Sequence, residues 1–348
     1  MTSSEALTAE RGGGDEVERR FVMSDPVFPQ FVGCGRSGTT LLRNIFDSHS
    51  VLAMTHESHF IGPLAKLRSR YESEAGFDTD VFVGDLFSDA NFVRQGLEVG
   101  DVRSALDKAR PETYAGAVRA VFAAYAAKDG KKLYGDKTPG SVTQIELLAE
   151  LFPEAKFVHI IRDGRAVALS YLERPEWGPE TMTEAAHHWK NRVRRGRTAG
   201  RVIGAERYME VRYEDLVADP EAVARKVCDF LGLEFEEGML RYHEKSKEFI
   251  ASTKDPEAFK NLSRPITAGL RDWEDEISRD DQKLFEAVAG DLLEELGYPV
   301  SGAAPNIGTR ARVMVAAASW QLKRLVSFLS ARTKRSGRSV DDFNGEVG

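Results

Sequence analysis

Apolar residues along this chain form short continuous runs that alternate with longer stretches of helical spacing. The clearest runs cover residues 27–33 and 156–161, and two weaker ones cover 132–135 and 208–211. Helical spacing is found over residues 112–128, 141–151, 181–203, 220–231 and 280–296. Buried strands that alternate with helices predict an α/β fold, in which helices flank both faces of a parallel sheet.

The two ends of the chain differ from this central region. Residues 1–25 are rich in Gly, Glu and Arg and have no apolar core, so we expect a mobile tail and not a secretory signal. No shift in composition marks a boundary between residues 26 and 300, which predicts one domain. Residues 301–348 are expected to form a separate extension, with a linker over 301–309 and a helix over 310–335.

Composition excludes several classes of protein. Of the 348 residues, 42% are hydrophobic and 30% are charged, which is typical of a globular protein. No uncharged apolar run is long enough for a membrane span. Two cysteines provide no disulfide framework and favour a reducing, cytoplasmic location. A net charge of −7 argues against nucleic acid as a partner, although it does not exclude a local basic pocket.

The loop after the first predicted strand has the spacing of a phosphate-binding loop. Residues 33–40 read G-C-G-R-S-G-T-T, which fits G-x-x-x-x-G-K-[ST] except that Thr39 occupies the lysine position. Glycines and the start of a helix direct backbone N–H groups toward an anion. Without the lysine, ATP or GTP hydrolysis is disfavoured. Arg36 restores a cation that is suited to bidentate contact with an oxyanion.

The segment Arg36–Leu42, R-S-G-T-T-L-L, resembles the 5′-phosphosulfate loop of sulfotransferases that use 3′-phosphoadenosine 5′-phosphosulfate (PAPS). The arginine form is closest to protein-tyrosine sulfotransferases and their bacterial relatives. The resemblance implies a P-loop-like α/β fold and sulfuryl transfer with PAPS as co-substrate and no metal. It covers about residues 27–299 and so assigns residues 26–300 to a sulfotransferase domain. The residues expected to bind the 5′ end are Gly35, Arg36, Ser37, Gly38, Thr39 and Thr40.

A second anion site is predicted where the run 156–161 ends. Arg162 follows this strand, and Ser170 lies just over two helical turns farther along the chain. The segment V-H-I-I-R-D-G-R-A-V-A-L-S is similar to the family's 3′-phosphate motif. Because ligands of parallel sheets bind beyond the carboxyl ends of the strands, both loops should face one crevice. Two anion sites match a nucleotide with phosphates at its 5′ and 3′ ends.

Three further segments resemble family motifs. Lys137, in D-K-T-P, matches the lysine that helps polarise the departing phosphate bridge. Tyr213, in V-R-Y-E-D-L, matches a tyrosine beside the nucleotide. Arg264, in Arg264-Pro265 ahead of Trp273, matches a late loop over the 3′-phosphate, but the full Arg-Lys-Gly signature of cytosolic members is absent.

Transfer to a hydroxyl also needs a general base, and the segment H-E-S-H at 56–59 offers three candidates. Glu57 lies twenty residues after Ser37, the spacing at which the tyrosine-sulfating branch carries its catalytic glutamate. The predicted catalytic residues are therefore Glu57, Lys137 and Arg36. His56 or His59 is the alternative base, because an imidazole titrates near neutral pH. No third cluster of ligands supports a metal at these histidines.

The C-terminal extension is strongly basic. Between residues 310 and 338 there are eight Lys or Arg and no acidic residue, and apolar residues recur at helical spacing. One hypothesis is a helix that lies on an anionic membrane surface, which would make the enzyme peripheral at the inner face. The other is a helix packed on the acidic core or on the partner in a homodimer.

Together these patterns predict an enzyme that moves the sulfuryl group of PAPS to a hydroxyl of a small molecule, lipid, glycan or tyrosine. Two alternatives remain: a kinase-like P-loop enzyme with an atypical loop, and a nucleotide-binding protein without catalysis. The segments expected to shape the acceptor pocket, about 59–110 and 173–182, carry no interpretable motif.

Overall fold

A parallel five-stranded sheet forms the centre of the computed structural model, which describes residues 26–244, 246, 262–263, 273–302 and 308. The strand order is β2-β5-β1-β6-β7, and every neighbouring pair is parallel. The strands are β1 (Phe28–Gly33), β2 (Leu52–Met54), β5 (Leu133–Lys137), β6 (Ala155–Ile161) and β7 (Tyr208–Arg212). This confirms the predicted α/β class.

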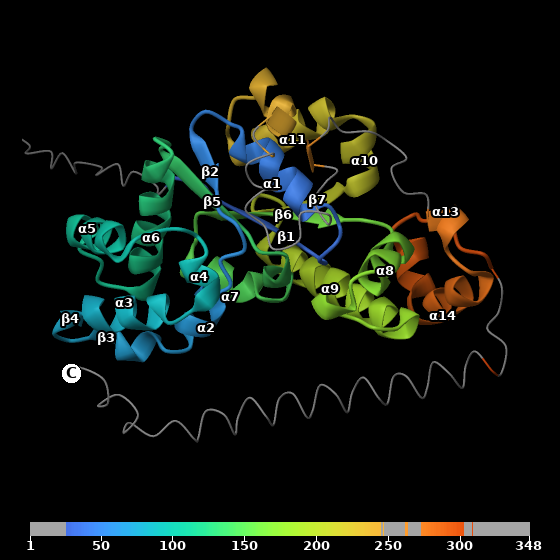
Figure 1. Cartoon of the computed structure of the whole chain (residues 1–348), viewed down its shortest axis with the longest axis horizontal. Coiled ribbons are helices and arrows are strands. Elements are labelled where there is room, and N and C mark those ends of the chain that lie inside the picture. Colours follow the sequence, from blue (N-terminus) through green and yellow to red (C-terminus); the bar gives the residue numbers. More distant parts are fainter. Residues whose placement is uncertain (1–25, 245, 247–261, 264–272, 303–307, 309–348) are drawn as a thin grey trace, which may run out of the picture.

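Helices cover both faces of the sheet (Figure 1). One face is covered by α1 (Thr39–Asp47), α10 (Tyr213–Ala218), α11 (Pro220–Leu231) and the 3-10 helix η4 (Glu237–Arg241). The opposite face is covered by α6 (Tyr114–Lys128), α7 (Ile145–Leu151) and α9 (Met182–Ile203). Next to α9 lie α8 (Gly164–Leu172) and α14 (Arg279–Glu295), and α8 is in turn contacted by η3 (Pro175–Trp177) and α13 (Trp273–Glu276).

Alternation along the strands explains the two main cores. Phe28 and Val32 of β1 point to the face of α6 and α7, whereas Phe31 between them joins Phe46 of α1 on the other face. A third cluster surrounds Trp189 of α9, whose side chain is fully buried among α8 and α14. Burial of such aromatic side chains is the main stabilising contribution to this arrangement.

A mostly helical insertion separates β2 from α6. It contains α2 (Ile61–Ala65), η1 (Arg68–Arg70), the hairpin β3 (Glu72–Ser73) and β4 (Gly76–Phe77), α3 (Thr79–Phe87), α4 (Ala90–Val93) and α5 (Val99–Ala109). The buried aromatic residues Tyr71 and Phe82 join this insertion to Tyr114 of α6. The insertion lies within the segment that carries no interpretable sequence motif.

The predicted elements are confirmed with small changes at their ends. The helix predicted over 141–151 is divided into η2 (Pro139–Thr143) and α7, because Gln144 between them is not helical. Strand β5 continues through Asp136 to Lys137, so the predicted catalytic lysine ends a buried strand. Within the described residues, no helix is both long and apolar enough to cross a bilayer. The predicted N-terminal tail and the helix over 310–335 lie outside the described residues.

Candidate active site

The phosphate loop joins β1 to α1 at the carboxyl edge of the sheet. Gly38 precedes α1 with φ +90°, a left-handed conformation that favours glycine, and a Cβ there would lie 2.4 Å from a ring carbon of Tyr213. No described side chain caps α1, so the first-turn N–H groups remain available to an anion. The Ser37 hydroxyl is fully buried and has no hydrogen-bond partner among the described residues. A bound anion would provide that missing partner.

Arg36 connects this loop to α8. Its Nε donates to Ser170 Oγ at 2.9 Å, and its guanidinium lies 4.9 Å from the centroid of the Trp177 ring. Arg36 itself has φ +69°, which is uncommon for a residue other than glycine. The surrounding contacts therefore hold Arg36 in one orientation across the space between the two predicted anion sites.

Arg162 lies against the same loop from the end of β6. Its Nη1 donates to the backbone oxygen of Arg36 at 3.3 Å, and its guanidinium lies 4.4 Å from the centroid of the Tyr213 ring. The two loops thus touch each other directly. The sequence predicted that these two loops face one crevice, and the structure places the loops side by side, with Ser170 bonded to Arg36 and not to Arg162.

A buried ionic cluster supports the loop that follows Arg162. Asp163 caps α8 by accepting from the backbone N–H of Arg165, and it also binds the Arg165 guanidinium at 2.7 Å. The same guanidinium binds Glu286 of α14 at 2.9 Å and lies 3.6 Å from the centroid of the Trp273 ring. These contacts fix the direction in which Arg162 leaves the sheet.

The predicted base and the predicted catalytic lysine form an ion pair. Lys137 Nζ donates to Glu57 Oε1 at 2.9 Å, and His59 Nε2 lies 2.9 Å from Glu57 Oε2. The Lys137 side chain is only 4% exposed, whereas that of Glu57 is 41% exposed. Each carboxylate oxygen of Glu57 thus has its own partner, and the side chain remains partly accessible to solvent.

The charges around Glu57 set its protonation. Burial favours the neutral carboxyl, but the Lys137 ammonium and the hydrogen bond from His59 outweigh it and hold the pKa of Glu57 well below its usual range. Burial, together with the positive charges of Arg43 and Lys137, lowers the pKa of His56 to about 2. The alternative base His56 is therefore neutral at pH 7 and weakly basic.

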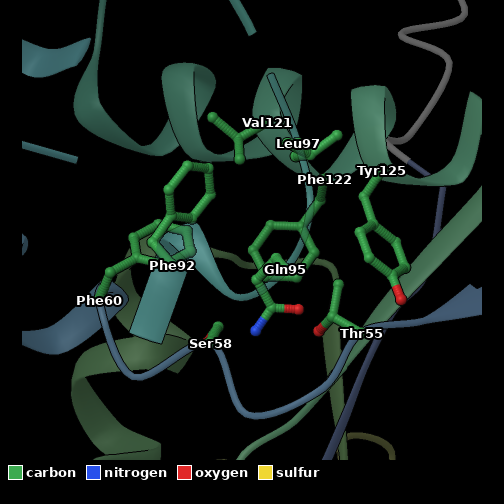
Figure 2. A pocket seen from close by; sticks show the side chains of 9 residues that line it. All are labelled: Thr55, Ser58, Phe60, Phe92, Gln95, Leu97, Val121, Phe122 and Tyr125. Carbon is green, nitrogen blue, oxygen red and sulfur yellow. The ribbon is translucent and has the colours of Figure 1, made fainter. Parts of the chain in front are cut away.

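Side chains that were not among the predicted site residues hold the base segment in place. Thr138 Oγ1 accepts from the Ser58 backbone N–H at 2.9 Å, and Gln95 Nε2 donates to the Glu57 backbone oxygen at 3.0 Å. Figure 2 shows a pocket beside this segment, which Gln95 lines together with aromatic side chains such as Phe60 and Phe92. The one sequence signal for these contacts is that Ser58 directly follows Glu57.

The structure brings most of the predicted site residues to one edge of the sheet. The phosphate-loop residues, Arg162, Ser170 and Tyr213 form one continuous group, and Lys137 with Glu57 stands at the end of β5, the strand next to β1. Arg264 lies outside the described residues. Among the described residues no three His, Cys, Asp or Glu side chains gather as a metal site, and freedom from metal stays a prediction.

Comparison with known proteins agrees with this geometry. The model of the sulfotransferase family matches residues 26–237, more than half of the chain. The chain is 24% identical over 282 residues to protein-tyrosine sulfotransferase A of Caenorhabditis elegans, covering 79% of this chain and 68% of that protein. It is 29% identical over 177 residues to an omega-hydroxy-beta-dihydromenaquinone-9 sulfotransferase of Mycobacterium bovis, covering 47% of this chain and 40% of that protein.

A solved structure, the sulfotransferase domain from the curacin biosynthetic pathway, is 19% identical to this chain, with a TM-score of 0.48 over 80% of this chain and 99% of that one. The family match begins just ahead of β1 and includes both anion-binding loops. The chain therefore belongs to the sulfotransferase family, as the resemblance of its phosphate loop predicted.

Proposed function

We propose that this chain transfers the sulfuryl group of PAPS to a phenolic hydroxyl, with Glu57 as the general base. The single observation that carries the proposal is the contact between the two loops, in which Arg36 binds Ser170 and Arg162 binds the Arg36 backbone. This contact makes one continuous cationic site whose two ends suit the two ends of a 3′,5′-bisphosphorylated nucleoside. The phenolic acceptor is suggested by the protein-tyrosine sulfotransferases among the relatives.

Each of the two loops binds one end of the nucleotide. The 5′ end binds the backbone N–H groups and side chains of Gly35, Arg36, Ser37, Gly38, Thr39 and Thr40. The 3′-phosphate binds Arg162 and Ser170, because the Ser170 hydroxyl can accept from Arg36 and still donate its own proton. Tyr213 lies beside both, and Arg264 is expected to close over the 3′-phosphate.

The transfer step follows from the positions of Lys137 and Glu57. The acceptor oxygen forms a bond to sulfur while the bond from sulfur to the bridging phosphate oxygen breaks, and PAP (the 3′,5′-bisphosphate product) leaves with the electron pair. Arg36 and Lys137 neutralise the charge that grows on that oxygen. Glu57 takes the acceptor's proton.

Lys137 must therefore bind two anions, one after the other. In the structure its ammonium binds Glu57 Oε1, which keeps this carboxylate weakly basic. PAPS offers the ammonium a second anionic partner, and transfer of Lys137 to it releases Oε1 for the acceptor's proton. The base then becomes effective only when the sulfuryl donor is bound.

The two alternative functions fit the site less well. A P-loop kinase needs a cation at the position of Thr39 for the β- and γ-phosphates, and the second cationic group at Arg162 has no role with ATP. If the protein only bound a nucleotide, the Glu57–Lys137 pair at the edge of the sheet would have no function.

Calorimetry and a transfer assay test the proposal together. We expect PAP to bind the full-length protein without Mg²⁺ and more tightly than ATP with Mg²⁺, because only PAP carries a 3′-phosphate. We also expect ³⁵S to pass from labelled PAPS to N-acetyltyrosinamide in the presence of a chelator. Tighter binding of Mg-ATP would favour the kinase, and PAP binding without any transfer to phenols or alcohols would favour a binding protein.

A further inference from the structure

His59 occupies the second carboxylate oxygen of the proposed base. Its Nε2 lies 2.9 Å from Glu57 Oε2, while Lys137 Nζ lies 2.9 Å from Glu57 Oε1. The His59 side chain is 42% exposed, against 4% for Lys137. Glu57 is thus held between a buried cation on the side of the sheet and a solvent-accessible imidazole.

The direction of the His59–Glu57 hydrogen bond follows from the charge of Glu57. Since the pKa of Glu57 is held low, its carboxylate is ionised at neutral pH and can only accept. His59 Nε2 therefore carries a hydrogen and donates it. The second proton of the imidazole is gained or lost at Nδ1, so the hydrogen bond to Glu57 exists in both charge states.

The backbone turns sharply to place this ring. His59 has φ +53°, a left-handed conformation that is uncommon outside glycine and is often found at functional sites. Its neighbours Ser58 and Phe60 are buried, and the Phe60 N–H donates to the Ser58 carbonyl at 2.6 Å. The turn therefore keeps the two flanking side chains inside while the imidazole stays outside, against Glu57.

We infer that His59 is a positioning residue that keeps Glu57 in place when Lys137 turns to the sulfuryl donor, and that the charge of His59 sets how strongly Glu57 attracts the acceptor's proton. The inference rests on the proposed role of Glu57. His59 reaches the reaction only through this carboxylate.

The sign of the pH effect follows from the charges that face His59, which are those of Glu57, Asp136 and Lys137. The hydrogen bond to Glu57 raises the pKa of His59 above its ordinary value, and burial and Lys137 oppose this. Protonated His59 stabilises the Glu57 carboxylate and weakens it as a base. Neutral His59 still donates its hydrogen bond but no longer does so as a cation, so turnover should rise as pH increases through the pKa of His59.

A pH profile of kcat/KM tests this, with labelled PAPS and N-acetyltyrosinamide, whose phenol stays protonated below about pH 9. We expect the wild type to gain about threefold or more as His59 loses its proton. His59→Gln should lack this step, because its amide donates without titrating. His56→Gln is the matched control and should keep the step, since His56 stays neutral over the whole range.

Two further variants separate charge from position. His59→Asn tolerates the left-handed backbone but is too short to reach Glu57, so we expect it to lose both the step and about tenfold in kcat. In the PAP complex, the NMR-detected pKa of the His59 imidazole should fall in Glu57→Gln relative to the wild type. This second measurement needs no acceptor substrate.

The outcomes distinguish the two proposals. Full turnover by Glu57→Gln would overturn both the base assignment and the inference. An inactive Glu57→Gln, combined with a wild-type pH profile in His59→Gln or an unchanged His59 pKa in Glu57→Gln, would overturn the inference alone. A His59→Gln variant that is inactive at every pH would show that His59 takes the proton itself, which also contradicts a positioning role.

Discussion

Arg36→Ala is expected to abolish measurable sulfuryl transfer and to weaken PAP binding. The substitution removes the guanidinium that binds Ser170 and lies against Trp177, and with it the cation nearest the 5′ end. Loss of one charge-assisted hydrogen bond predicts PAP binding weaker by about tenfold to a hundredfold. Loss of a charge that stabilises the transition state adds about 10²–10³ in kcat.

Calorimetry with PAP and a single-turnover assay measure these two effects. Arg36→Lys keeps the charge but not the fork of donors, so it should fall between wild type and Arg36→Ala. Arg103→Ala is the control, because Arg103 is exposed and pairs with Asp80 in the insertion. Wild-type PAP affinity in a folded Arg36→Ala protein would contradict the assignment of the 5′ site.

Glu57→Gln is expected to preserve nucleotide binding and to reduce kcat by about 10²–10⁴, the usual contribution of a general base. The amide keeps the size of the carboxyl but cannot take the acceptor's proton. It also lacks the charge that binds Lys137, so PAP binding should be unchanged or tighter. Arg36→Ala is therefore expected to lower both PAP binding and turnover, whereas Glu57→Gln is expected to lower turnover alone.

Rates at saturating PAPS and acceptor, together with PAP titrations, separate these effects. Glu221→Gln is the matched control, because Glu221 is exposed and forms a surface pair with Arg225 on α11. If Glu57→Gln turned over at the wild-type rate under saturation, another group would have to accept the proton.

The anion-binding loops could be predicted because each depends on a few adjacent residues. A strand, a glycine turn and a helix start lie within Gly33–Thr40, and Arg162 follows directly on a strand. The local backbone geometry therefore fixes the positions from which these side chains project. The carboxyl ends of parallel strands then bring the two loops together whatever the intervening sequence.

The partners of these residues could not be predicted, because they come from segments whose paths depend on tertiary packing. Trp177 reaches Arg36 from the short 3-10 helix η3 after α8, and Gln95 reaches Glu57 from the insertion. Strand β2 has only three residues, too few for a recognisable pattern, and ends three positions before Glu57. The Lys137–Glu57 pair joins residues eighty positions apart, a contact that no local pattern specifies.

The most direct test of the central claim is a crystal structure of the full-length protein with PAP. We expect the 5′-phosphate within hydrogen-bond distance of the N–H groups of residues 37–40, and the 3′-phosphate in contact with Arg162 and Ser170. Phosphates bound at separate places on the surface, or an Arg162 that contacts neither of them, would contradict it.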